Sequence, residues 1–211
     1  MRSLAFGLLA VSTLFVIVDP VAAVPAFLAM THDDTAERRI RMARLACAVT
    51  ATVLLVFAVL GTWIFNVLRI TLPAFQLAAS VILLLIALDM LRAQRSRVQE
   101  TREDTDAGAA KEDIAVTPLA VPMLAGPGAI STAILLHNEA KGWIEQLVLY
   151  AAIILVAAAS YVILNLAARG ASRLSPIATR IAERVMGLLL AAVAFQFMLN
   201  ALQAVVTQLR P

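Results

Sequence analysis

Six continuous apolar segments constrain this chain more than any other feature of its sequence. They cover residues 3–31, 45–65, 72–91, 115–137, 146–168 and 185–207. A hydrocarbon layer about 30 Å thick is crossed by roughly 20 apolar residues in a helix. The runs are continuous, whereas the strands of a membrane barrel alternate apolar and polar residues. The sequence therefore predicts an all-α polytopic membrane protein with six transmembrane helices.

The composition fits helices in lipid and argues against several soluble functions. Hydrophobic residues make up 62% of the chain and charged residues 15%, whereas soluble domains carry about 25% charged residues. Lys and Arg lie mostly in the connections between apolar segments, so we expect a lipid bilayer and no nucleic acid as partner. The single cysteine, Cys47, excludes a disulfide framework and a thiolate metal site. Nucleotide-binding, zinc-protease and hydrolase motifs are absent from the sequence, so we expect no enzyme, cofactor or metal.

The basic residues are distributed unequally between alternate connections. Loops 32–44, 92–113 and 169–184 contain four, five and four of them, and the opposite side has only Arg2, Arg69, Lys141 and Arg210. Basic loops of membrane proteins stay on the cytoplasmic side. We therefore expect a multi-pass membrane protein with its basic loops in the cytoplasm and both termini outside.

The start of the chain has a rival interpretation as a secretory signal peptide. Met1 and Arg2 precede an apolar run, and Val21-Ala22-Ala23 resembles a small-residue cleavage site. Cleavage there would turn all three arginine-rich loops to the wrong side of the membrane. We favour an uncleaved first helix.

The chain divides into two halves of opposite orientation. Residues 1–211 form one predicted membrane domain, with a three-helix repeat at 1–91, a charged cytoplasmic loop at 92–114 and a second repeat at 115–211. The first half begins outside and the second inside, so any likeness between them describes an inverted repeat.

Two alignments suggest that likeness. Pro20 and Pro25 are five residues apart in the first span, and Pro122 and Pro127 are five apart in the fourth. Aligning residues 80–91 with 187–198 sets Ser80 on Gly187 and Asp89 on Gln196. The predicted fold is therefore two inverted three-helix repeats.

The prolines predict that spans 1 and 4 are interrupted. Proline lacks a backbone donor and clashes with the preceding turn, so we expect breaks at Asp19–Pro25 and at Ala125–Gly128. Irregular backbone at membrane depth is tolerated where it is buried in protein or lines a cavity. Paired interrupted helices in inverted halves indicate the central site of a transporter. The alternative is a pair of proline kinks that serve only helix packing.

Asp19 is the one ionisable residue well inside a predicted span. A charge at that depth is costly unless it faces protein or water. A carboxylate there suits the binding and release of a proton, or the holding of a cationic group. Alternatively, Asp19 caps the helix that begins at Pro20.

The stretch Gly126-Pro127-Gly128, followed by Ser131 and Thr132, resembles the start of a second half-helix. Proline suits the first helical position, and free N–H groups at a helix N-terminus attract anions such as a carboxylate. The two hydroxyls would add donors. Close helix packing through small residues is the alternative.

Three more polar residues are candidates for the site. Asp89 lies three residues before Arg92 at the cytoplasmic end of span 3, where an interfacial ion pair is the simpler interpretation. Gln196 and Asn200 are four residues apart and share a helix face. Interhelical hydrogen bonds and the lining of a solute pathway both fit that pair.

Three motifs of this chain resemble the MarC family of six-span bacterial inner-membrane proteins. They are Asp19-Pro20 with Pro25, IALDML at 86–91 and PLAVPMLAGPGAIST at 118–132. The likeness covers essentially the whole chain, and Pro118–Thr132 is its most specific part. The family is similar to LysE-type exporters, and the resemblance implies a transporter of small neutral amino acids.

The first half departs from the family pattern. Relatives read DPxGNxP in span 1, whereas Ala22 and Ala23 stand here at the Gly and Asn positions. The family's Arg-Ile-Ala-Gly-Gly in span 3 corresponds here to Gln76-Leu77-Ala78-Ala79-Ser80. The identity of the substrate therefore does not carry over from the resemblance.

These features predict a secondary transporter that moves a small solute by alternating access. A zwitterion fits the two breaks, with its carboxylate on half-helix N-termini and its ammonium on carbonyls or Asp19. Proton coupling through Asp19 is a hypothesis. A passive channel and a non-transporting scaffold or stress-response factor are the alternatives, and a homo-oligomer is compatible with the sequence.

Overall fold

Helices occupy all six predicted apolar segments in the computed structural model, which describes residues 2–31, 34–92, 115–170 and 176–209. The described residues contain no strand, which confirms the all-α prediction. In chain order the helices are α1 Arg2–Val18, α2 Pro20–Met30, α3 Ala36–Leu68, α4 Leu72–Arg92, the π-helix η1 Ala115–Leu124, α7 Pro127–Glu139, α8 Trp143–Gly170 and α9 Pro176–Leu209.

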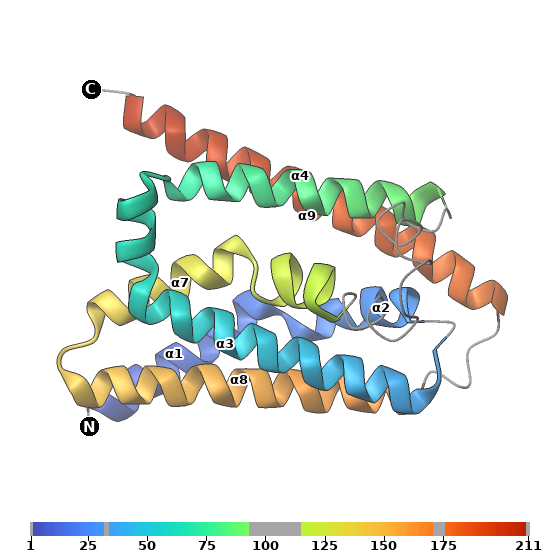
Figure 1. Ribbon diagram of the computed structural model, residues 1–211, viewed down its shortest axis with the longest axis horizontal. Helices are drawn as coiled ribbons and strands as arrows, with labels where there is room; N and C mark the ends of the chain where they lie inside the picture. Colours follow the sequence, from blue (N-terminus) through green and yellow to red (C-terminus); the bar gives the residue numbers. More distant parts are fainter. Residues whose placement is uncertain (1, 32–33, 93–114, 171–175, 210–211) are drawn as a thin grey trace.

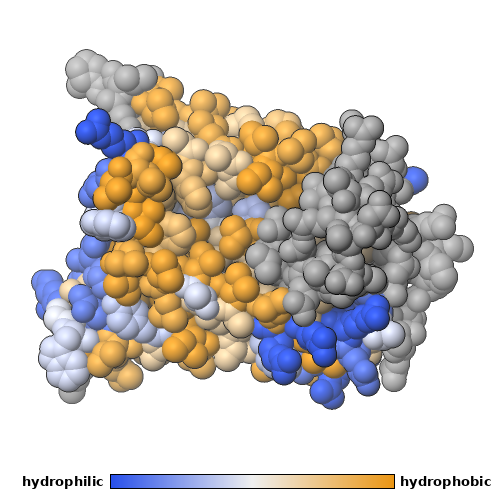
Figure 2. Space-filling view, in the orientation of Figure 1, coloured by the Kyte–Doolittle hydropathy of each residue, from blue (hydrophilic) through white to orange (hydrophobic). Residues whose placement is uncertain are grey.

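Length and hydropathy mark the molecule as an integral membrane protein with several crossings. Four helical stretches are long and apolar enough to span a bilayer, namely Arg2–Met30, Ala36–Leu68, Trp143–Gly170 and Gly187–Thr207. The apolar stretch of α4, Leu72–Leu88, is shorter. An apolar band crosses the middle of the face in Figure 2, with polar residues toward its two ends. The two termini lie toward the same end of the molecule (Figure 1).

The larger apolar core lies between α1, α2, α3, η1, α7 and α8. Phe27 of α2, Leu54 of α3 and Leu149 of α8 are among its fully buried side chains. In Figure 1, α8 runs along one side of this group, and η1 and α7 lie on the opposite side, toward α4. The two short helices of each interrupted segment are thus held inside the bundle by the long, continuous helices α3 and α8.

A smaller cluster joins α4 and α9, which run side by side along the top of Figure 1. Ala87 of α4 and Ala194 of α9 are buried here, together with Ala26 of α2. A β-carbon added to Gly187 would lie 3.0 Å from the carbonyl oxygen of Ala87. Small residues therefore allow the backbones of α4 and α9 to approach closely, as they do between membrane helices in general.

Two helices extend beyond the predicted apolar segments, since α3 begins at Ala36 and α9 at Pro176. Much of the predicted loops 32–44 and 169–184 is therefore helix. Arginine, alanine and glutamate are good helix formers, so a helix continues beyond the apolar stretch into polar surroundings. Thr35 caps α3, and its hydroxyl accepts a hydrogen bond from the backbone N–H of Arg38 at 3.4 Å. The charged loop at 93–114 lies outside the described residues.

Both predicted interruptions are present, and a proline follows each one directly. Pro20 is the first residue of α2 and Pro127 the first residue of α7. The predicted pairing of Pro20 with Pro122 and of Pro25 with Pro127 is nevertheless wrong as a structural match. Pro25 lies inside α2, after its break, whereas Pro122 lies in η1, before its break. The equal spacing therefore does not reflect equivalent positions, and the first break is confined to Asp19 instead of extending to Pro25.

Candidate functional site

The first break is a single residue in the left-handed conformation. Asp19 has φ 43° and ψ 63°, a region that aspartate and asparagine tolerate better than other side-chain-bearing residues. Its Oδ1 accepts a hydrogen bond from the backbone N–H of Ala22 at 3.2 Å, so Asp19 is the N-cap of α2. The side chain is exposed. The capping interpretation is thus confirmed, and the carboxylate also stays accessible to a ligand.

Prolines leave backbone carbonyls near this break without their helical donors. Pro20 has no N–H for the carbonyl of Val16, and Pro25 has none for the carbonyl of Val21. These two carbonyls lie on either side of Asp19 in the chain. The break therefore combines a carboxylate with carbonyl acceptors, which is a set of groups suited to a cation or an ammonium.

The second break has a different chemical character. Gly126 is the N-cap of α7 with φ −72° and ψ 171°, and α7 has no side-chain cap. A β-carbon at Gly126 would lie 2.7 Å from the carbonyl oxygen of Pro122, so the close backbone approach requires glycine. The first N–H groups of α7 carry the partial positive charge of a helix N-terminus. This break suits an anion.

The hydroxyls predicted to assist this N-terminus are engaged or partly covered. Ser131 donates a hydrogen bond to the carbonyl of Pro127, one turn earlier in α7. Ser131 and Thr132 are both half-buried. The Ser131 hydroxyl therefore supports the first turn of α7 in this arrangement, and a ligand would have to compete with the Pro127 carbonyl for its proton.

The fold brings the two breaks together. A β-carbon added to Gly128, in the first turn of α7, would lie 3.4 Å from Cγ2 of Ile17, near the end of α1. Helix α1 contacts α7, and α2 contacts η1. Phe197 of α9 approaches the second break, with its Cε2 3.8 Å from a β-carbon placed on Gly126. Two segments far apart in the sequence thus meet with an anionic cap on one and a cationic helix end on the other.

The other predicted site residues do not join the breaks. The amide of Gln196 donates to Oδ1 of Asn200 at 2.8 Å, which confirms that they share a face, but both are exposed. They lie on the opposite side of α9 from Ala194, which is buried. Asp89 is in the last turn of α4, and its side chain lies outside the described residues.

Comparison with known proteins establishes the family. The profile described as MarC family integral membrane protein matches residues 4–206. The chain belongs to the MarC family. A UPF0056 membrane protein of Methanocaldococcus jannaschii is 34% identical over 200 residues, which cover 95% of this chain and 97% of the relative.

Bacterial relatives show similar coverage. The UPF0056 membrane protein YvbG of Bacillus subtilis is 33% identical over 86% of this chain and 87% of its own length. The UPF0056 membrane protein YhcE of Escherichia coli is 28% identical over 91% of this chain and 89% of its own length. No solved structure matches significantly.

The residues that depart from the expected MarC pattern lie at the first break and in α4. Ala22 is exposed and supplies the N–H that Asp19 caps, while Ala23 is buried. In α4, Gln76 is half-buried, and Ser80 is fully buried and donates to the carbonyl of Leu77 at 2.7 Å. Asp19 therefore makes its capping bond in this MarC protein with Ala22 and Ala23 at the two positions that depart from the pattern.

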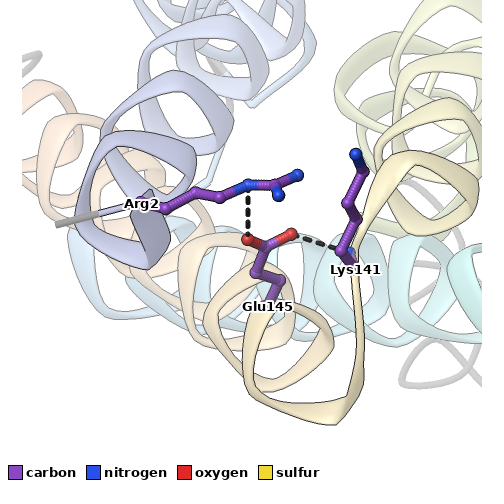
Figure 3. A network of polar contacts seen from close by, with 3 residues as sticks. All are labelled: Arg2, Lys141 and Glu145. Atoms are coloured by element: carbon purple, nitrogen blue, oxygen red, sulfur yellow. Dashed lines mark hydrogen bonds and ion pairs between the residues drawn. The ribbon is translucent and has the colours of Figure 1, made fainter.

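A buried glutamate that the sequence analysis missed ties three segments together at one end of the molecule. Oε1 of Glu145 lies 3.3 Å from Nε of Arg2, and Oε2 accepts the backbone N–H of Lys141 at 2.7 Å (Figure 3). Only 6% of the Glu145 side chain is exposed, compared with 64% for Arg2. The sequence could have indicated this glutamate, because Glu145 lies in the first turn of α8 and a carboxylate stabilises the N-terminus of a helix.

The first half has a counterpart of opposite charge, also missed because its arginine was assigned to a loop. Arg39 is buried in the first turns of α3, and its Nε donates to the carbonyl of Thr31 at 2.8 Å. Thr31 is the C-cap of α2. Arg39 and Glu145 therefore each hold the connection between the interrupted segment and the following long helix, one as donor and the other as acceptor.

Proposed function

We propose that this MarC-family protein is a secondary transporter of a small solute that works by alternating access. The single observation that carries the proposal is the meeting of two interrupted helices from different halves, with Ile17 against Gly128. Paired discontinuous helices are the usual site of substrate binding in transporters with inverted repeats. Catalysis plays no part in the proposed activity.

Six crossings in two inverted halves are part of this proposal. Helix α3 of the first half contacts η1 and α7 of the second, and α8 of the second half contacts α1 and α2 of the first. The equivalent long helices also pair with each other, α3 with α8 and α4 with α9. Reciprocal contacts of this kind are expected when two similar halves are related by a pseudo-two-fold axis.

We place the basic connections in the cytoplasm and both termini outside the cytoplasmic membrane. The first turns of α3 carry exposed Arg38, Arg41 and Arg44. Polar residues gather toward the lower right of Figure 2, the end at which α3 begins in Figure 1. The positive-inside rule assigns this end to the cytoplasm.

The solute class that best fits the two breaks is a small zwitterion such as a neutral amino acid. Its carboxylate would meet the uncapped N-terminus of α7 at Gly126. Its ammonium would meet the Asp19 carboxylate and the carbonyls of Val16 and Val21, whose i+4 residues are prolines without an N–H. Asp19 would also take up and release a proton during the cycle, which would couple transport to a pH gradient.

The test uses purified protein in proteoliposomes, after a thermal-shift screen of neutral amino acids and related metabolites has found a stabilising ligand. Wild-type protein should take up that ligand with saturation and counterflow. Non-saturating flux would indicate a channel instead. The absence of both binding and flux for every solute would support a scaffold.

Asp19→Asn separates the proposed functions of the carboxylate from its capping bond. The asparagine oxygen still accepts the Ala22 N–H, so folding should be preserved while uptake driven by a pH gradient falls at least tenfold. Unchanged gradient-driven uptake would exclude proton coupling through Asp19. Glu139→Gln is the matched control, because Glu139 is exposed at the end of α7 and should not affect uptake.

A further inference from the structure

Helix α9 presents a seam of exposed residues at the spacing of a coiled coil. Their separations alternate between four and three residues over nearly three heptads, as do the a and d positions of a helix pair. We call them the α9 seam, and all are exposed: Leu189, Val193, Gln196, Asn200, Gln203 and Thr207.

The α9 seam faces away from the rest of the chain. At about 100° per residue, its four polar members lie roughly 180–240° around the helix from Ala194. Ala194 is buried against α4 and α2, as are Leu190 and Ala191. The seam therefore does not line a pathway between the helices of one molecule.

Lipid cannot satisfy the polar part of this seam. Gln196 lies near the middle of Gly187–Thr207, a stretch apolar and long enough to span the bilayer. Its bond to Asn200 uses one amide N–H and one carbonyl oxygen, whereas the two amides together offer four N–H donors and two oxygens. Within the described part of the chain, the remaining groups make no other hydrogen bond. Asparagine and glutamine in membrane helices bond across helix interfaces.

We propose that the α9 seam is a homodimer interface, and that its occupant is the same seam of a second copy. Two copies inserted in the same orientation are related by a two-fold axis along the membrane normal, so their α9 helices run parallel. Each seam residue then faces its own counterpart. Amides both donate and accept, so Gln196 and Asn200 pair with themselves across the axis.

The inference concerns assembly only and does not depend on which solute the protein moves.

The test is site-directed cross-linking in native membranes. The only cysteine, buried Cys47, is replaced by alanine, and one cysteine is introduced as Val193→Cys in the seam. Oxidation by copper phenanthroline should form a disulfide between the cysteines at position 193 of two copies. The matched control is Leu155→Cys, because Leu155 is an exposed apolar residue near the middle of α8. Cross-linking at position 155 equal to that at 193 would overturn the proposal, as would a product that contains a different protein.

A second variant tests the amides directly. Gln196→Leu with Asn200→Leu, in the Val193→Cys background, keeps the outer face compatible with lipid. The loss of interhelical hydrogen bonds should weaken dimerisation on the order of tenfold. Two differently tagged wild-type copies should also co-purify. The double substitution should reduce the amount of protein that co-purifies. Dimerisation unchanged by the double substitution would overturn the function assigned to the amides.

Discussion

Both interrupted segments of this chain are followed by a long helix, but the polar groups at their breaks and connections differ in charge. Asp19 puts a carboxylate at the N-cap of α2, whereas Gly126 leaves α7 with no side-chain cap. Arg39 donates to the connection after α2, whereas Glu145 accepts from the connection after α7. A helix break requires only a proline and a suitable cap residue. The choice of that residue sets the charge presented to a ligand.

The largest expected effect on stability concerns the close backbone contact at Gly126, which has no counterpart at the first break. Gly126→Ala places a β-carbon 2.7 Å from the Pro122 carbonyl oxygen, which is backbone and cannot turn away. The free energy of unfolding should fall by about 2 kcal/mol, measured by thermal unfolding in detergent. Gly128→Ala is the control, because its β-carbon meets only the Ile17 side chain at 3.4 Å, and it should cost less than about 1 kcal/mol. Equal losses would show that the second break does not depend on glycine.

A somewhat smaller effect is expected at the first break. Asp19→Ala removes the acceptor for the Ala22 N–H and places alanine in the left-handed region. The variant should lose about 1–2 kcal/mol of stability. Asp19→Asn keeps both the acceptor and the tolerance for this conformation, so its thermal unfolding should match that of the wild type. If the alanine variant proved as stable as the asparagine variant, capping would not hold this break together.

The smallest effect concerns the connection after α7. Glu145→Ala leaves the Lys141 N–H without its acceptor and should cost about 1 kcal/mol. Glu145→Gln keeps that acceptor and loses only the ion pair to exposed Arg2, so it should cost about 0.5 kcal/mol or less. Glu139→Ala, at an exposed glutamate of α7, serves as the control. If Glu145→Gln lost as much stability as Glu145→Ala, the ion pair to Arg2 would be the interaction that stabilises this connection.

The sequence predicted much of the site because helix interruption is a local property. Proline at the first position of α2 and α7 follows from its missing N–H and fixed φ, so both breaks could be located from Pro20 and Pro127. The π-helical character of η1 was not predictable in the same way. Pro122 interrupts the α-helical ladder there, and the N–H of Ala125 bonds five residues back to the carbonyl of Ala120.

The sequence by itself determined the helical segments, their apolar character and the residues that begin each half-helix. Those properties depend on hydropathy and backbone chemistry within a few residues. Only the tertiary structure decided that Ile17 meets Gly128, that Arg39 and Glu145 are buried, and that Gln196 and Asn200 face outward. Apolar helices resemble one another on every side, so the face that each one buries is fixed by the close fit of small residues such as Gly187 and Ala194.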